Sequence, residues 1–454
     1  MTLTFCGGAR AVTGANYLIA VDGEQILVDC GLTQGTSFAE AKNFEPFGYD
    51  PASIRALLLT HAHADHVGRV PKLVREGFRG KVFATPPTIE LARLILEDSQ
   101  QVMAKEAELT GGPVLYQLAD VKAVEPLWRA VDYHERIEVA PGVAAMFRDA
   151  GHMLGAASIA LYVAEGRGTT TLVFSGDLGN APTPILRAPE RISSADWLVV
   201  ESVYGDRRHE DRENRRAKLL KIVRSTIERR GVLMIPVFAV ERTQELLFEL
   251  NDFVEGGHIQ RVPMFLDSPL AIRATEVYRK YPQYFNRSAG ALVASGDDLF
   301  RFPGLVFTET KEASIRINDV PAPKIILAGS GMTQGGRIHH HLIRYLPDPK
   351  STFLSVGYHV AGSIGRRLLE GETELELRGE RIPVAARVEA IGGYSGHADR
   401  AALCDWVRPM AATVRQIFVV QGEVHASEAL AQSLQTELRV AAVVPASGET
   451  VELG

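Results

Sequence analysis

A short apolar run ends at Thr60, and the six residues after it, His61 to His66, hold three histidines and one aspartate. The run IRALLLT is typical of a buried strand, so we expect the polar cluster in the loop at its carboxyl end. Imidazole suits zinc, and imidazoles mixed with a carboxylate are typical of a catalytic metal site with an open position. A solvated histidine-rich loop is the alternative, but four such side chains directly after a buried strand favour a metal site.

Two further candidate ligands follow apolar strands later in the chain. His152 lies in a glycine-flanked loop after VAAMFRDAG, and Asp177 is the last residue of TTLVFSGD. Each alone is more typical of a turn, but together with the first cluster they predict two metal positions. We expect His61, His63 and His152 at one zinc ion, Asp65 and His66 at a second, and Asp177 between the two. Such a pair generates hydroxide at neutral pH and favours hydrolysis of a phosphodiester. Asp29 is expected to accept a hydrogen bond from a metal-binding histidine.

Length and composition limit the class of protein. A chain of 454 residues predicts two or three domains, and 46% apolar with 23% charged residues is the balance of a folded protein. The net charge of -6 excludes a global basic field, so a polyanion has to bind at a local patch. We find no leader-like start, no apolar run of membrane-spanning length and no disulfide framework among three scattered cysteines. We therefore expect a cytoplasmic protein without a membrane partner.

The order of the predicted elements indicates two domains, one inserted into the other. Residues 16–21 and 24–28 read as a hairpin that turns at Asp22-Gly23, and the first 200 residues mix strands and helices in layers. After Tyr204, strands and helices alternate, which is typical of a parallel α/β unit. We expect a first domain at 1–205 that resumes at 385–454, with an inserted domain at 206–384.

The combined motifs resemble a known family. HAHADH, the later Gly-His and the Ser-Gly-Asp together resemble the metallo-β-lactamase fold, whereas HAHADH alone also fits glyoxalase II or ribonuclease Z. ESVYGDR, GYSGHAD and VVQGE resemble the extra motifs of its β-CASP branch, which processes RNA and DNA, and the chain is similar to bacterial relatives of the cleavage and polyadenylation endonuclease. The resemblance covers nearly the whole chain. It implies an αββα sandwich with an inserted parallel-sheet β-CASP domain, and a zinc-dependent ribonuclease that uses metal-activated hydroxide in a cleft between the two domains.

The resemblance also assigns roles to individual residues. His61, His63 and His152 would hold one zinc, and Asp65, His66 and the shared Asp177 would hold the second. Glu201 would orient His397, which would face the scissile phosphate as general acid, so that the catalytic set is Asp65, Asp177, Glu201 and His397. A carboxylate beside an imidazole raises its pKa and keeps it protonated for the leaving oxygen.

One position departs from the family pattern. Gln421 stands where the third extra motif normally supplies a histidine to the second zinc. An amide oxygen is a weaker and harder ligand than imidazole, so the second site is expected to bind weakly or to prefer another metal. Whether His425 takes its place is left open.

Substrate contacts are expected in the inserted domain. The segment AGSGMTQGGR follows an apolar strand and opens a helix, where backbone N–H groups and the helix dipole can receive a phosphate. Ser330, Gly331 and Arg337 are the candidates, and a glycine-rich turn without a ligand is the alternative. We expect His339, His340 and His341 at the surface or facing phosphate, Arg366 and Arg367 as further phosphate contacts, Arg242 in an internal pair, and 207–218 as a solvated face.

Three functions are compatible with these residues. The first is a zinc-dependent ribonuclease, endo- and/or 5′-exonucleolytic, with single-stranded RNA as partner and a homodimer left open. The second is a non-catalytic RNA-binding or scaffold homologue whose metal site has decayed at Gln421. The third, a small-molecule hydrolase of glyoxalase type, is disfavoured because such enzymes need no phosphate-gripping insertion and lack the Glu201–His397 pair.

Overall fold

The computed structural model describes the chain except residues 36, 167, 210–213, 332, 334, 358, 360 and 361. The described residues form two compact units: Met1–Pro182, Arg187–Arg208 and His397–Gly454 make the first, and Thr183–Leu186 and His209–Gly396 make the second. The expected insertion ends at 384, whereas the second unit continues to Gly396. The reason is that β19 (Arg387–Ala390) pairs in parallel with β16 (Thr352–Ser355) in the sheet of the second unit. No helix in the described part of the chain has the length and apolar character needed to cross a membrane.

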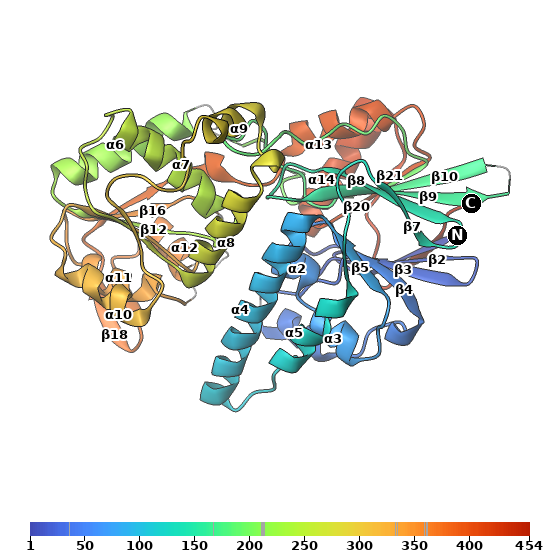
Figure 1. Cartoon of the computed structure of the whole chain (residues 1–454), viewed down its shortest axis with the longest axis horizontal. Coiled ribbons are helices and arrows are strands. Elements are labelled where there is room, and N and C mark those ends of the chain that lie inside the picture. Colours follow the sequence, from blue (N-terminus) through green and yellow to red (C-terminus); the bar gives the residue numbers. More distant parts are fainter. Residues whose placement is uncertain are drawn as a thin grey trace. The chain divides into compact units, whose positions relative to one another are not determined.

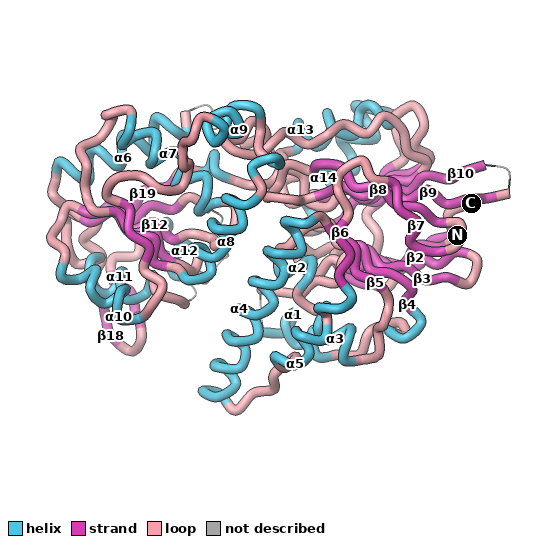
Figure 2. Tube along the Cα trace, in the orientation of Figure 1, coloured by secondary structure: helices cyan, strands magenta, loops and turns pink. Residues whose placement is uncertain are grey.

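The first unit is a sandwich of two seven-stranded sheets, which Figure 2 shows as stacked magenta strands. One sheet has the order β22-β1-β2-β3-β4-β5-β6 and the other β21-β20-β11-β10-β9-β8-β7. The strands are β1 (Thr2–Gly7), β2 (Asn16–Val21), β3 (Glu24–Val28), β4 (Ile54–Leu58), β5 (Lys81–Ala84), β6 (Trp128–Ala130), β7 (Arg136–Ala140), β8 (Val143–Asp149), β9 (Ala157–Glu165), β10 (Gly168–Phe174), β11 (Trp197–Glu201), β20 (Gln416–Val420), β21 (Ala442–Val443) and β22 (Thr450–Glu452). A single buried apolar cluster that includes Phe5, Leu58, Phe147 and Phe418 draws on both sheets, so the core lies between them.

Helices lie outside the two sheets of this unit (Figure 1). Beside the first sheet are α1 (Ser37–Ala41), α2 (Ala64–Val67), α3 (Val70–Arg75), α4 (Pro86–Thr110) and α5 (Leu118–Ala123). Beside the second are α13 (Arg400–Val407) and α14 (Val424–Ser433). The expected αββα sandwich is confirmed.

The hairpin predicted near the start of the chain is also confirmed. Strands β2 and β3 pair antiparallel, with Tyr17 opposite Val28 and Val21 opposite Glu24. Asp22 and Gly23 both have positive φ, 50° and 85°. Two positive φ angles in a two-residue loop match the right-handed twist of the flanking strands, which is why Asp-Gly marks this turn.

The carboxyl ends of several strands meet at one edge of the sandwich. Strands β10, β11 and β20 run parallel, and β8 runs the same way because both β8 and β10 are antiparallel to β9. The end of β4, in the other sheet, joins this edge because the Ala157 N–H donates to the Thr60 carbonyl at 2.8 Å. The loops after these five strands are therefore neighbours, although they are far apart in sequence.

The second unit contains a six-stranded sheet of order β14-β13-β15-β12-β16-β19 in which every pairing is parallel, as the alternation of strands and helices predicted. Its other strands are β12 (Val232–Pro236), β13 (Met264–Asp267), β14 (Leu305–Phe307) and β15 (Lys324–Ala328), with β17 (Glu374–Leu377) and β18 (Glu380–Pro383) as a separate hairpin. Its helices are α6 (Arg215–Glu228), α7 (Arg242–Glu255), α8 (Pro269–Lys280), α9 (Arg287–Ala294), α10 (Lys311–Arg316), α11 (Ile338–Tyr345) and α12 (Ile364–Leu369).

A buried ion network joins α6 and α7 in this unit. Arg242 donates to Glu245 at 2.7 Å, and Arg215 lies 3.2 Å from the same carboxylate. Both guanidinium groups lie over the ring of Tyr394, whose hydroxyl donates to Glu249. The internal pairing predicted for Arg242 is therefore confirmed.

Gly31 offers a direct test of how closely the chain packs beside the end of β3. A Cβ atom at Gly31 would lie 1.5 Å from the carbonyl oxygen of Asp65, so Gly31→Ala has to displace the start of α2. We expect Gly31→Ala to destabilise the protein by about 1–3 kcal/mol, the usual range for overpacking. Gly48→Ala is the matched control, because a Cβ at Gly48 meets no atom within 4 Å. Scanning calorimetry checks both, and equal melting temperatures for the two variants would contradict the packing argument.

Candidate metal centre

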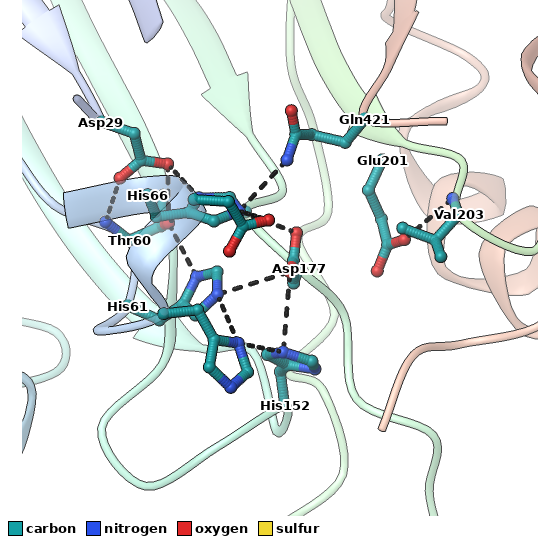
Figure 3. Close-up of polar contacts among 12 residues, drawn as sticks. Asp29, Thr60, His61, His66, His152, Asp177, Glu201, Val203 and Gln421 are labelled. Atoms are coloured by element: carbon teal, nitrogen blue, oxygen red, sulfur yellow. Dashed lines mark hydrogen bonds and ion pairs between the residues drawn. The ribbon is translucent and has the colours of Figure 1, made fainter. Parts of the chain in front are cut away.

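Four side chains converge at the shared edge of the first unit. His61 and His63 follow β4, His152 follows β8, and Asp177 follows β10. The Nδ1 atom of His63 lies 3.2 Å from His61 Nε2 and 3.1 Å from His152 Nε2, and Asp177 Oδ2 lies 3.4 and 3.6 Å from the same two Nε2 atoms. A tetrahedral zinc site with bonds of about 2.0–2.1 Å has ligand atoms about 3.3–3.4 Å apart. The four atoms therefore fit the corners of one metal site (Figure 3).

The protonation of these histidines suits a metal. Burial, followed by the neighbouring His61 ring, lowers the pKa of His63 well below its usual value. Burial and the nearby His397 do the same for the pKa of His152. Metal ligation needs the neutral imidazole, so at neutral pH a metal ion does not have to displace a proton from either ring.

Asp29, at the end of β3, orients His66 directly and His61 through Thr60. Its Oδ1 accepts the Thr60 N–H at 2.8 Å, and its Oδ2 accepts the Thr60 hydroxyl at 2.8 Å and His66 Nδ1–H at 2.7 Å (Figure 3). Because the Thr60 hydroxyl donates to Asp29, its oxygen is free to accept Nδ1–H of His61, 3.1 Å away. These bonds leave the Nε2 atoms of both rings for a metal. Asp29 was predicted from the sequence, whereas Thr60 was not, because its only signal is its place between the strand and the first histidine.

The second expected metal position is less complete. His66 Nε2 lies 3.4 Å from Asp177 Oδ1 and 3.9 Å from Asp65 Oδ2, so the three expected residues are neighbours. Burial lowers the pKa of His66, but the carboxylates of Asp177, Asp29 and Asp65 raise it well above its usual value. A metal at this position has to displace a proton from His66, unlike a metal at His63 and His152.

Gln421, at the end of β20, contacts the second position and His425 does not. The Nε2 atom of Gln421 lies 3.2 Å from His66 Nε2 (Figure 3). The same atom donates to the Val12 carbonyl at 3.0 Å. His425 is 59% exposed, and its Nε2 lies 3.2 Å from Asp206. His425 therefore does not replace the missing histidine.

His397 and Glu201 lie beside the first metal position. His397 Nδ1 lies 3.4 Å from Glu201 Oε1 and 3.8 Å from Asp177 Oδ2. Glu201 is fully buried, and its two oxygens accept the N–H groups of Leu178 and Val203 at 2.7 and 3.2 Å. Burial lowers the pKa of His397, but the Glu201 carboxylate and its hydrogen bond raise it to about 9. The imidazole is therefore protonated at neutral pH.

The glycine-rich loop of the second unit has internal partners that local patterns did not reveal. Arg337 donates to Asp267, at the end of β13, at 2.8 Å, and to the carbonyls of Thr308 and Glu309 at 2.6 and 2.8 Å. The guanidinium group thus has three internal acceptors, and the phosphate role of Ser330, Gly331 and Arg337 stays a prediction. Residues 332 and 334 of this loop lie outside the described residues.

One expectation about the histidines of α11 is wrong, and the phosphate role of Arg366 and Arg367 stays a prediction. His341 is buried and its Nε2 donates to Asp267 at 2.7 Å, so the prediction that all three consecutive histidines face the surface or phosphate is wrong for His341. Arg366 pairs with Glu370 at 2.7 Å, and Arg367 pairs with Glu372. Both arginines therefore form ion pairs with nearby acidic residues. In the basic segment 207–218, residues 210–213 lie outside the described residues.

Comparison with family models gives three adjoining matches along the chain. Residues 10–231 match the metallo-beta-lactamase superfamily, and residues 243–368 match the Beta-Casp domain. Residues 381–445 match the Zn-dependent metallo-hydrolase RNA specificity domain. The first two models confirm the family resemblance of the sequence, and the third covers the segment that returns after the inserted unit.

Two curated relatives and one solved structure are similar over most of the chain. Ribonuclease TTHA0252 of Thermus thermophilus is 41% identical over 88% of this chain and 89% of its own length. The transcription termination factor FttA of Methanosarcina mazei is 32% identical over 99% of this chain and 71% of its own. A crystal structure of a protein of unknown function from Enterococcus faecalis V583 covers 100% of this chain and 99% of that chain, with a TM-score of 0.55 and 11% identity. This last likeness supports the fold alone.

The role of Asp29 can be tested through metal affinity. Asp29→Asn removes the charge and places an N–H group against the donors of Thr60 and His66, so both rings lose their fixed orientation. We expect zinc affinity to fall about 10- to 100-fold, as is usual when the partner of a metal-bound histidine is lost. Asp22→Asn, at the exposed hairpin turn, is the control. Zinc titration by calorimetry measures both, and equal affinities would show that Asp29 does not organise the site.

Asp267 should make the second unit sensitive to acid. Burial raises the pKa of Asp267, but hydrogen bonds from His341, Ser314, Thr308 and Arg337 lower it to about 2 from 3.8. A lowered pKa stabilises the fold above the unfolded value of 3.8, and this stabilisation is lost as the pH falls from 3.8 towards 2. We expect Asp267→Asn to cost up to about 2 kcal/mol at pH 7 and progressively less below pH 4.

Calorimetry of Asp267→Asn across this pH range, with Asp297→Asn as control, provides the measurement. A deficit that stays the same from pH 7 down to pH 3 would show that the Asp267 charge is not what stabilises this cluster.

Proposed function

The chain belongs to the metallo-beta-lactamase superfamily and carries a Beta-Casp domain, and from this premise we propose that it is a metal-dependent nuclease that hydrolyses phosphodiester bonds of RNA. The observation that carries the proposal is the convergence of His61, His63, His152 and Asp177 at tetrahedral distances, next to the His397–Glu201 pair. RNA is the proposed substrate because the returning segment matches an RNA specificity domain and the Thermus relative is named a ribonuclease. The proposal covers endonuclease and 5′-exonuclease action.

In this proposal His61, His63, His152 and Asp177 hold one zinc ion. A bound divalent metal supplies a nucleophile by acidifying water and withdraws charge from the phosphoryl oxygens. The protein's own part is to hold three imidazoles and one carboxylate in fixed positions. Asp29 and Thr60 orient His61, and the loop after β8 carries His152. Asp65, His66 and Asp177 are the residues proposed for a second zinc ion, at the weaker of the two positions.

His397 is the proposed general acid. Its Nδ1 faces Glu201, so Nε2 is the ring nitrogen that can present a proton to a substrate. Because Glu201 keeps the imidazolium charged at neutral pH, Nε2 can donate its proton to the leaving oxygen as the phosphodiester bond breaks. Glu201 is a positioning residue in this scheme, since its buried carboxylate holds His397 and contacts no substrate atom.

RNA cleavage by the full chain tests the function. End-labelled single-stranded RNA should be cut in the presence of zinc and left intact when a chelator is added. His63→Ala should abolish cleavage and reduce bound zinc, whereas His397→Gln should slow cleavage about 10²- to 10⁴-fold, the usual contribution of a general acid. His397→Gln should keep its zinc, because His397 lies outside the first metal position.

The matched control for these histidine variants is His134→Ala, whose ring is 58% exposed and pairs with Glu190. We expect its cleavage rate to equal that of the wild type. If the zinc-loaded wild type binds RNA without cutting it, the chain is a non-catalytic RNA-binding homologue and the proposed function is wrong.

A further inference from the structure

The side-chain amide of Gln421 has a defined orientation. Its Nε2 atom lies 3.0 Å from the Val12 carbonyl oxygen, and this contact is a hydrogen bond only if the atom is nitrogen. Turning the amide round would set two carbonyl oxygens about 3 Å apart and would lose the bond. The backbone holds the residue in place as well, since Gln421 N–H donates to the Gly8 carbonyl at 2.7 Å. The Val12 carbonyl therefore keeps the nitrogen of Gln421 towards His66 and the oxygen away from it.

The atom of Gln421 at the second metal position is thus of the wrong kind. Its Nε2 lies 3.2 Å from His66 Nε2, a distance that separates two ligands of the same metal. An amide nitrogen carries two hydrogens and no free lone pair, so it cannot be a ligand. The Gln421 amide therefore presents N–H groups, and no lone pair, at the place where the family pattern has a metal ligand.

The oxygen of Gln421 is fixed on the far side of the amide. Among the described residues, Oε1 is buried and has no hydrogen-bond partner. It lies beside Gly8, where an added Cβ would come within 2.2 Å of it and within 2.7 Å of the Tyr17 hydroxyl oxygen. Because Gly8 has no side chain, it leaves the space that the Gln421 Oε1 atom occupies. His425 does not supply the missing ligand, because it is exposed and pairs with Asp206.

We propose that this chain binds one zinc ion tightly, at His61, His63, His152 and Asp177. The Gln421 amide, which presents N–H groups beside His66, weakens zinc binding at the second position. The inference rests on the proposed function only in that both concern the same metal centre. It makes the centre mononuclear at ordinary zinc concentrations, in a family whose pattern supplies one more histidine. Residues Asp65 and His66 then lie beside the single metal ion and hold a second one only at high zinc concentration.

Zinc content of the full chain tests the proposal. After loading with zinc and gel filtration in metal-free buffer, elemental analysis should give one zinc per wild-type chain and two per Gln421→His chain. Gln421→Glu, which offers a carboxylate oxygen, should raise the affinity of the second position and serves if Gln421→His does not fold. Gln101→His adds a histidine on the exposed face of α4 and should still give one zinc.

Calorimetric titration provides the affinities. We expect the second zinc to bind the wild type at least tenfold more weakly than it binds Gln421→His. Two tightly bound zinc ions in the wild type, or equal second-site affinities in wild type and Gln421→His, would overturn the proposal. RNA cleavage by the same samples separates the two ideas: one zinc without cleavage removes the proposed function alone, and two zinc ions with cleavage remove the mononuclear centre alone.

Discussion

The carboxylate of Asp29 is the interaction on which the metal centre depends. A buried charge is costly unless several donors satisfy it, and Asp29 receives three, from the Thr60 N–H, the Thr60 hydroxyl and His66. These bonds join the end of β3 to the end of β4 and fix the proton of two imidazoles on Nδ1. This arrangement requires a left-handed backbone conformation at Asp29, whose φ is 59°. Asn16 stabilises that conformation by donating a hydrogen bond to the Asp29 carbonyl at 2.8 Å.

Much of this arrangement was predictable because the ligands obey a simple rule of sheet geometry. Each candidate ligand follows an apolar strand, and parallel strands bring their carboxyl ends to one edge, so His61, His152 and Asp177 could be grouped from sequence. The αββα layers and the parallel inserted sheet were predictable for a related reason, since strand and helix periodicity survive in the sequence. Gln421 was recognised as a departure from the family pattern, but the direction of its amide was not.

The features that escaped prediction depend on partners distant in sequence. Arg337 was expected at a phosphate because it follows a glycine-rich loop. Its acceptor Asp267 comes from β13, and no residue near Arg337 in the sequence indicates this pairing. His341 was expected at the surface or facing phosphate, yet it is buried and its acceptor Asp267 again comes from β13. The Val12 carbonyl, which decides the orientation of Gln421, is a backbone group and has no sequence signature at all.

The second metal position can lack a histidine ligand without loss of the first, because the two positions share only one expected ligand. Asp177 directs Oδ2 to His61 and His152, and Oδ1 to His66, so only this carboxylate belongs to both positions. Thr60, held by Asp29, orients His61 of the first position, and the loop after β8 carries His152. None of these groups contacts Gln421 through a hydrogen bond described in the structure. A change at the end of β20 therefore alters the second position and leaves the geometry of the first intact, which is how a chain with glutamine at this place can keep a hydrolytic metal site.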